Sequence, residues 1–153
     1  DLDATLRECF RVLKKGGQLL HTFNLPESFT EFYTELEQVL IKLKLESSVP
    51  LMRTQILEKR KPLHVVRNLL LEHGFEISEV HEDKFHYHFS DGTVMLNHHS
   101  IRVAFIEGWK KIVPERHQKE VFRETEKAMN KKAKRMDGFN LTVPFALVDC
   151  RRS

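Results

Sequence analysis

Features that would place the chain in specialised classes of protein are scarce or missing from its 153 residues. Cys9 and Cys150 are its only cysteines, too few for a disulfide-stapled fold, so free thiols in a reducing cytoplasm are the simpler interpretation. No run of about 18 or more apolar residues is present, so no membrane partner is expected. The first residues also lack the charged and then apolar pattern of a signal peptide. We therefore expect a cytoplasmic protein.

An excess of charge of one sign is missing as well. Lys and Arg number 25 against 22 Asp and Glu, which gives a formal net charge of +3. The basic residues are interleaved with acidic ones and form no stripe, so no nucleic-acid partner is expected. Hydrophobic residues make up 41% and charged residues 31%, which excludes wholesale disorder and fits one domain over residues 1–153.

The first part of the chain shows helical and strand patterns separated by glycine and proline. Apolar residues from Leu2 to Leu13 fall on one helix face, and Gly16-Gly17 end that helix. Because the helical pattern is already present at the start, we expect the natural beginning of the protein to lie elsewhere. Residues 18–25 form a short apolar run between glycines and a proline, which predicts a strand buried on both faces.

A long helix is predicted next. Ser28 and Glu31 have the spacing of a capping box, and apolar residues then repeat with helical spacing to near Leu45. Residues 46–50 are predicted as a turn. Residues 51–61 are polar and fit either a loop or a short helix.

Pro62 is typical of a helix start, and Gly74 of the C-cap of the same helix. Residues 75–81 and 85–89 are predicted as two strands, the second with a polar face. Asp91-Gly92 indicates a turn.

The remaining chain is predicted to be mainly helical before a last strand. Residues 93–97 fit a returning strand or the lead-in to a helix. Helices are predicted over residues 98–112 and from Glu115 to about Met136. Residues 141–150 predict the last strand, in which Pro144 indicates a bulge or an edge-like position.

The segment Arg11–Leu20, a helix ending in two glycines before an apolar strand, resembles class I S-adenosylmethionine-dependent methyltransferases. Leu69–Phe75 resembles the family's "LLxxxGF" before its sixth strand. The resemblance implies a partial Rossmann-like α/β sheet made of strands five, six and seven, with flanking helices. In the family, strand seven runs antiparallel between strands five and six. Residues 85–139 resemble a helical insertion between the last two strands.

The glycine-rich turn with which this family holds S-adenosylmethionine is missing. Gly16-Gly17 precede a strand and not a helix, so they cannot play that part. The resemblance therefore implies a C-terminal half without strands one to four, and no cofactor-binding residue is assigned. We do not expect this chain alone to bind S-adenosylmethionine tightly.

Ligands of open α/β sheets lie beyond the carboxyl ends of the strands, which makes Asn24 a candidate substrate-binding residue. Asn24 can also simply end the strand with a turn. Tyr33 is a second candidate, although its place on an apolar helix face equally fits the core.

Histidines supply the catalytic candidates. His86 and His88 share one strand face, and His98 follows the next turn. An imidazole can act as general base near neutral pH. A metal site would need further converging ligands, and no cysteine lies close, so no metal is predicted. A solvated polar face is the simpler alternative.

Methyl transfer from S-adenosylmethionine to a small-molecule substrate is the function that the resemblance implies for the full-length protein. The rival is a non-catalytic half-domain that binds a partner or pairs with itself. Without strands one to four, strand five would have an open edge, and open edges favour pairing with another chain. A homodimer through this edge is therefore an expectation for the isolated chain.

Overall fold

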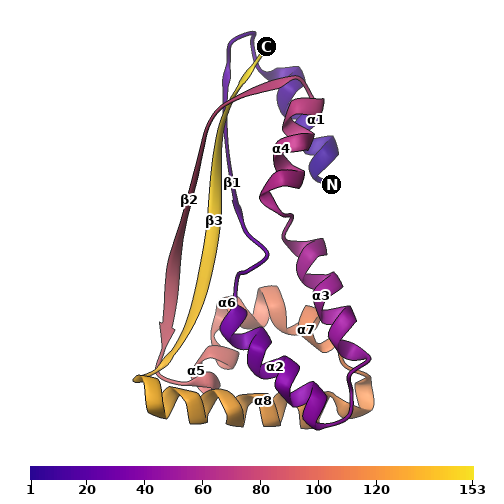
Figure 1. Cartoon of the computed structure of the whole chain (residues 1–153), viewed down its shortest axis with the longest axis vertical. Helices are drawn as coiled ribbons and strands as arrows, with labels where there is room; N and C mark the ends of the chain where they lie inside the picture. Colours follow the sequence, from indigo (N-terminus) through magenta and orange to yellow (C-terminus); the bar gives the residue numbers. More distant parts are fainter. The chain divides into compact units, whose positions relative to one another are not determined.

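A computed structural model describes residues 1–153 and gives a mixed α/β fold (Figure 1). Its elements, in chain order, are α1 (Leu2–Val12), β1 (Gln18–Asn24), α2 (Thr30–Lys42), α3 (Ser48–Lys59), α4 (Leu63–Glu72), β2 (Phe75–Phe89), α5 (Gly92–Asn97), α6 (His99–Ile101), the π-helical η1 (Arg102–Ile106), α7 (Glu107–Lys110), α8 (Glu115–Met136) and β3 (Phe139–Arg152). None of the helices is both long enough and apolar enough to cross a membrane.

The chain forms two compact units. The first consists of Asp1–Glu27, Lys59–Phe85 and Val143–Ser153, and the second of Ser28–Glu58 and His86–Thr142. The second unit therefore holds almost all of the expected insertion over residues 85–139, together with the helices α2 and α3.

The three strands form one sheet in the order β1-β3-β2. The last strand of the chain thus lies between the other two (Figure 1). It runs antiparallel to β1, with Gln18 opposite Arg151 and Asn24 opposite Phe145. This central position of the last strand, antiparallel to β1, is the one that the family resemblance implies.

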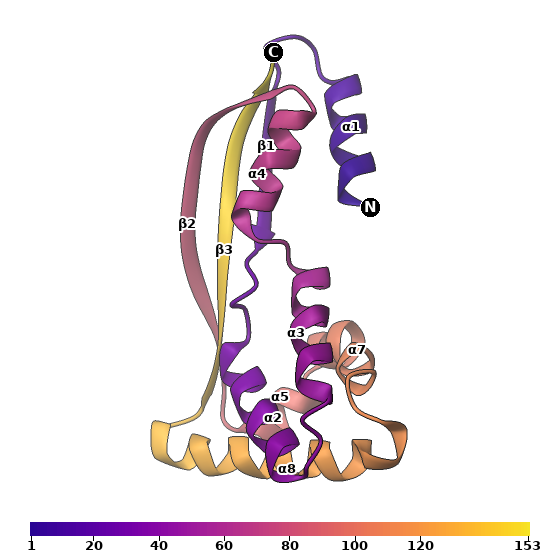
Figure 2. The same ribbon diagram turned by 45° about the vertical axis from the view of Figure 1, so that its right-hand side comes forward.

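The core of the first unit is formed by α1 and α4 against the strands; Figure 1 shows both helices on the same side of β1 and β3, and Figure 2 gives a second view of them. Fully buried members come from α1, α4, β2 and β3: Leu6, Val66, Leu70, Phe75, Val148 and Cys150. Leu19 and Phe23 of β1 pack against them. The buried residues of α1 and α4 belong to the apolar helix faces that the sequence predicts for these two segments.

Glycine and proline lie at the element ends in the first unit as the sequence predicts, although the C-cap residue of α4 is His73 and not Gly74. Gly16 lies in the left-handed region with φ 76°, between α1 and β1. Gly74 does so between α4 and β2 with φ 88°, and Pro62 is the N-cap residue of α4. At both glycines an L side chain would be strained.

The β1 strand differs from the prediction of burial on both faces. Leu19 and Phe23 are partly buried, while Leu20 on the opposite face is 56% exposed. Helices therefore cover only one face of this strand. Pro144 is not at an outer edge, because β3 is the central strand. Pro144 directly precedes Phe145, which is the residue of β3 where the pairing with β1 ends. The Pro144 carbonyl accepts a hydrogen bond from the Leu25 N–H at 2.8 Å.

The predicted capping box at Ser28 and Glu31 is wrong. The N-cap residue of α2 is Phe29, which has a left-handed backbone with φ 66° and makes no side-chain cap. The Glu31 carboxylate instead accepts the backbone N–H of Thr142 at 3.0 Å, and the Phe29 N–H donates to the Thr142 carbonyl at 2.8 Å. Hydrogen bonds to a distant strand have replaced the local cap.

Four further segments of the chain are also compared with the predictions. The residues predicted as two strands form the single strand β2. Asp91 does not begin a hairpin turn. It caps α5, because its carboxylate accepts the Val94 N–H at 2.8 Å. The helix predicted over residues 98–112 is divided into α6, η1 and α7. Residues 48–59 form α3, so the short-helix alternative for residues 51–61 is the one observed, and the helix begins inside the predicted turn.

Aromatic rings form the core of the second unit. The indole of Trp109 stacks on Phe32 with ring centroids 3.9 Å apart, and on Phe105 at 5.6 Å. The indole N–H donates to the Tyr33 hydroxyl at 2.9 Å. Helix α8 contacts α2, as Figures 1 and 2 show. It ends as predicted at Met136, before Gly138.

Candidate functional site

A polar face on neighbouring strands of the second unit brings two of the predicted histidines together. Nδ1 of His86 lies 3.0 Å from Oγ1 of Thr142, and Nδ1 of His88 lies 2.8 Å from Oδ1 of Asn140. Moving two residues forward along β2 moves the partner two residues back along β3, as in antiparallel strands. His86 and His88 therefore present exposed rings on one face of the sheet, as their spacing predicts.

The His86 end of this face is connected to α2. The Glu31 carboxylate accepts the Thr142 N–H through Oε2 and the Thr142 hydroxyl through Oε1. Glu31 and Thr142 are both partly buried, whereas His86 is exposed. Carboxylate, hydroxyl and imidazole thus form a continuous hydrogen-bonded chain that leads outward to the solvent.

The His88 end is built differently. The ring of His88 lies over Gly138, where a Cβ atom would come within 2.4 Å of Cε1 and 2.8 Å of Nε2. Gly138 also has φ 116°, which favours glycine. The backbone at this position therefore leaves the space that the imidazole occupies, and one edge of the His88 ring is covered.

The third predicted histidine lies apart from this hydrogen-bonded face. His98 is exposed and serves as N-cap residue of α6 without a side-chain cap. Its ring meets Phe89 edge-on, with centroids 5.5 Å apart. No hydrogen bond joins it to Thr142 or Asn140, so a catalytic role for His98 stays a prediction.

The two predicted substrate-binding residues have contrasting surroundings. Asn24 is exposed at the carboxyl end of β1, in the first unit. Tyr33 is 6% exposed, and its hydroxyl accepts the Trp109 indole hydrogen bond inside the second unit. The core position that the apolar spacing allowed for Tyr33 is thus the one observed. Substrate contact by either residue remains a prediction.

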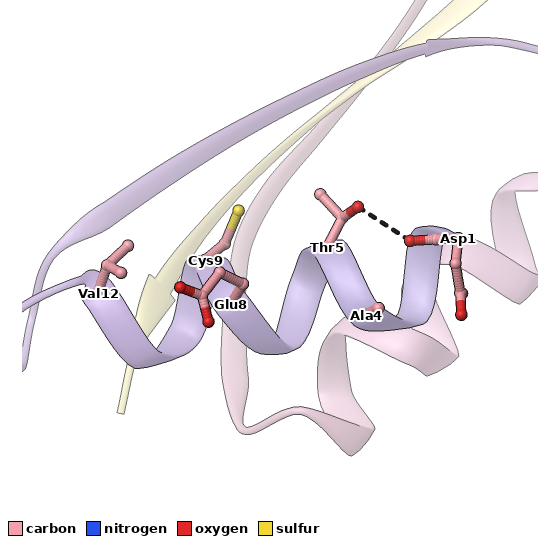
Figure 3. A pocket seen from close by; sticks show the side chains of 6 residues that line it. All are labelled: Asp1, Ala4, Thr5, Glu8, Cys9 and Val12. Carbon is pink, nitrogen blue, oxygen red and sulfur yellow. Dashed lines mark hydrogen bonds between the residues drawn. The ribbon is translucent and has the colours of Figure 1, made fainter.

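Each unit also carries a shallow hollow. In the first unit, a hollow of about 490 Å³ lies along α1, and Figure 3 shows the side chains that line it, from Asp1 to Val12. In the second unit, a hollow of about 350 Å³ lies beside the end of α8, lined in part by Asp91, Lys134 and Asp137. Neither hollow is lined by a residue that the sequence predicts as catalytic or substrate-binding.

The chemistry of the remaining candidate groups is limited. Burial raises the pKa of the Cys150 thiol to about 11, so this cysteine stays protonated near neutral pH. Its Sγ donates to the Leu19 carbonyl at 3.3 Å. No group of three or more His, Cys, Asp or Glu side chains is arranged to hold a metal ion.

Sequence reasoning missed Glu31 and Thr142 as parts of the site. Glu31 had been assigned to a helix cap, and Thr142 is one polar residue among the apolar residues of a strand. A signal for Thr142 is present, because Asn140 and Thr142 alternate with the buried Leu141 and Val143 and therefore define a polar face. No sequence signal links Glu31 to that face.

Comparison with known proteins shows a distant likeness to solved structures. No family model matches the sequence, and no curated protein matches it. Among solved structures, the chain is similar to a candidate methyltransferase from Bacillus halodurans, with 20% sequence identity and a TM-score of 0.47. The match covers 98% of this chain and 57% of the other, so the chain spans a little more than half the length of the protein it matches.

Proposed function

We propose that this chain is the C-terminal, substrate-side part of an S-adenosylmethionine-dependent methyltransferase. The full protein would move a methyl group from a sulfonium to a small-molecule acceptor by in-line transfer. Its main contribution would be to position the two reactants and exclude water. S-adenosylmethionine would supply the activated methyl group, and no residue of this chain is assigned to its binding.

The observation that carries the proposal is the order β1-β3-β2 with β3 antiparallel to β1. The resemblance assigns β1, β2 and β3 to strands five, six and seven, and in the family strand seven lies between the other two. The helix before each outer strand supports the same assignment, because α1 leads through Gly16-Gly17 into β1 and α4 leads through Gly74 into β2.

Uncovered apolar side chains in the first unit support the assignment to part of a larger sheet. Doubly wound sheets have helices on both faces. Here α1 and α4 cover the face of Leu19 and Phe23, while Leu20 is 56% exposed. Val12 on α1 is 62% exposed. Further strands and helices of a complete methyltransferase sheet would bury surfaces of this kind.

A small-molecule acceptor is favoured by the composition of the second unit. Acids are interleaved with its surface cations and pair with several of them, as in Lys132 with Glu35 at 2.9 Å and Lys42 with Glu124 at 3.3 Å. A nucleic-acid substrate needs a basic surface that is free to contact phosphates. The helices that follow β1 and β2 are therefore proposed to form the substrate side.

One observation favours the rival function. β1 has only β3 as a neighbour, so its other edge is free to pair with a strand of another chain. The isolated chain is therefore proposed to form a homodimer through β1. A half-domain whose role is self-pairing would have the same edge, so binding of the cofactor has to separate the two functions.

Calorimetric titration separates them when it compares this chain with the chain extended by the coding sequence upstream of Asp1. S-adenosylmethionine and its demethylated product are titrated into both. We expect binding weaker than about 1 mM for the chain alone, which corresponds to about −4 kcal/mol, and micromolar binding for the extended chain. Micromolar binding by the chain alone would overturn the absence of a cofactor site. Failure of the extended chain to bind would favour the self-pairing half-domain.

A further inference from the structure

Three side chains from separate segments of the second unit form a chain of hydrogen bonds. Glu31 lies in the first turn of α2, Thr142 on β3 and His86 on β2. The Thr142 hydroxyl bonds to the Glu31 carboxylate, and Nδ1 of His86 lies 3.0 Å from the same hydroxyl oxygen. A second bond, from the Thr142 N–H to the carboxylate at 3.0 Å, fixes the position of Glu31.

Counting protons along these hydrogen bonds shows which ring nitrogen of His86 carries no hydrogen. An ionised carboxylate can only accept hydrogen bonds, and a threonine hydroxyl has one hydrogen to donate. Because the Thr142 hydroxyl gives its hydrogen to Glu31, its oxygen can only accept from His86. Nδ1 of His86 must therefore carry the ring proton, which leaves Nε2 with a free lone pair on an exposed side chain.

We propose that Glu31 and Thr142 are positioning residues that make Nε2 of His86 the proton acceptor for a small-molecule substrate with a phenol-type hydroxyl. The assignment of methyl transfer to this step rests on the proposed function. A neutral imidazole takes a proton more readily from a phenol, with a pKa of about 10, than from an aliphatic alcohol.

The step is balanced in atoms and charge. The substrate hydroxyl gives its proton to Nε2 of His86 while its oxygen forms the bond to the methyl carbon. No residue of this chain is assigned to holding the methyl donor, which when bound would supply the methyl group and keep the electron pair of its carbon–sulfur bond. The positive charge of the sulfonium would then be replaced by that of the imidazolium. Glu31 faces that charge through Thr142 and stabilises it.

The neighbouring His88 does not have this arrangement. Its partner is the Asn140 side chain, which is not connected to a carboxylate by any described hydrogen bond. The edge of its ring that carries Nε2 also lies over Gly138. His88 is therefore a natural internal reference for an effect that depends on Glu31.

Long-range ¹H–¹⁵N correlation spectra of the imidazoles test the proposal on the chain itself, about two pH units above the ordinary histidine pKa of about 6.5. We expect Nδ1 of His86 in the protonated, pyrrole-type shift range and Nε2 in the pyridine-type range. Glu31→Gln can donate from its amide to Thr142, so the hydroxyl turns to His86 and the two assignments exchange. His88 keeps its spectrum.

Matched variants guard against indirect effects. Glu35→Gln removes a partly buried carboxylate one turn further along α2, which pairs with Lys132 and not with Thr142, so it leaves His86 unchanged. Thr142→Val removes the hydroxyl and shifts His86 towards the Nε2-protonated form, and Thr142→Ser restores the native tautomer. This second pair keeps the test open should the Glu31 variant fail to fold.

A native His86 protonated on Nε2, or one that does not respond to either Glu31→Gln or Thr142→Val, would overturn the proposal. This result is independent of the cofactor titration. The native tautomer together with no cofactor binding by the extended chain would refute methyl transfer and leave the hydrogen-bonded positioning of His86 standing. Cofactor binding by the extended chain together with an Nε2-protonated His86 would refute only the role of His86.

Discussion

The two units of the chain are built on different interactions. The first has a mainly aliphatic core, with Leu6, Val66 and Leu70 of the helices against Val148 of the sheet. The second has stacked rings around Trp109 and side-chain bonds that join separate segments, such as Glu31 to Thr142. Regular apolar spacing therefore describes the first unit, whereas hydrogen bonds between distant residues determine much of the second.

Removing the central side chain of each core gives the largest expected effect. Trp109→Ala removes the stacking on Phe32 and Phe105 and leaves the Tyr33 hydroxyl without its donor, so we expect a loss of about 3–5 kcal/mol in the free energy of unfolding. Leu70→Ala in the first unit removes no hydrogen bond, so its loss in the free energy of unfolding should be smaller than that of Trp109→Ala, within about 2–5 kcal/mol. Urea unfolding followed by far-UV circular dichroism measures both.

Tyr33→Phe is the control that separates the hydrogen bond from the stacking. It leaves the buried Trp109 N–H without an acceptor, at a cost of about 1–3 kcal/mol. A Trp109→Ala cost below about 1 kcal/mol would contradict an aromatic core. A Tyr33→Phe cost equal to that of Trp109→Ala would mean that the hydrogen bond, and not the stacking, dominates.

The same contrast explains how much of the fold could be predicted. In the first unit, Gly16-Gly17, Pro62 and Gly74 act locally, and they correctly predict the starts of β1 and β2, while α1 and α4 end a few residues before the glycines. In the second unit, Ser28 and Glu31 have a good capping spacing, yet Thr142, 111 residues away from Glu31, binds the carboxylate instead. A local pattern cannot show that a distant strand offers a better partner.

For the candidate site, the sequence predicts the strand face of the histidines but not their hydrogen-bond partners. The spacing of His86 and His88 correctly placed both rings on one strand face. Their partners could not be predicted, because these depend on the register between β2 and β3, and no turn of fixed length joins the two strands. The 49 residues from Ser90 to Gly138 separate them. Tyr33 has a spacing that fits both a core and a ligand wall, and only the position of Trp109 shows that it is core.

Glycine substitutions sharpen the comparison at the level of the backbone, with a smaller expected effect. At Gly138 in the second unit, φ is 116°, and a Cβ would come within 2.8 Å of the Phe89 carbonyl oxygen as well as close to the His88 ring. At Gly16 in the first unit, φ is 76° and no atom lies within 4 Å of such a Cβ. We expect Gly138→Ala to cost about 2–3 kcal/mol and Gly16→Ala about 1 kcal/mol.

Thermal unfolding of both variants, with the ring signals of His88 as a second readout, checks this difference. Gly138→Ala should move the His88 signals, since the ring must leave its place over residue 138. Equal costs at the two positions would show that the left-handed backbone alone matters. Unmoved His88 signals would show that the ring does not lie over Gly138.

A change of pH gives the smallest expected effect, and it acts on the first unit. Burial lowers the pKa of His21 on β1 below its ordinary value of 6.5, so the folded chain takes up this proton at a lower pH than the unfolded chain. Between these two pH values the unfolded state holds more protons, and the free energy of unfolding rises with pH. The contribution is complete above pH 6.5 and is lost as the pH falls through the folded-state pKa.

His21→Gln removes this titration, so the unfolding free energy of the native chain should fall more than that of the variant between about pH 8 and about pH 5. The same substitution at exposed His81 of β2 is a control for the change of side chain itself. Equal pH dependence for the native chain and His21→Gln would refute the effect of burial. Because His21 lies opposite Val148 in the β1–β3 register, the result also tests whether protonation weakens the strand pair on which the first unit depends.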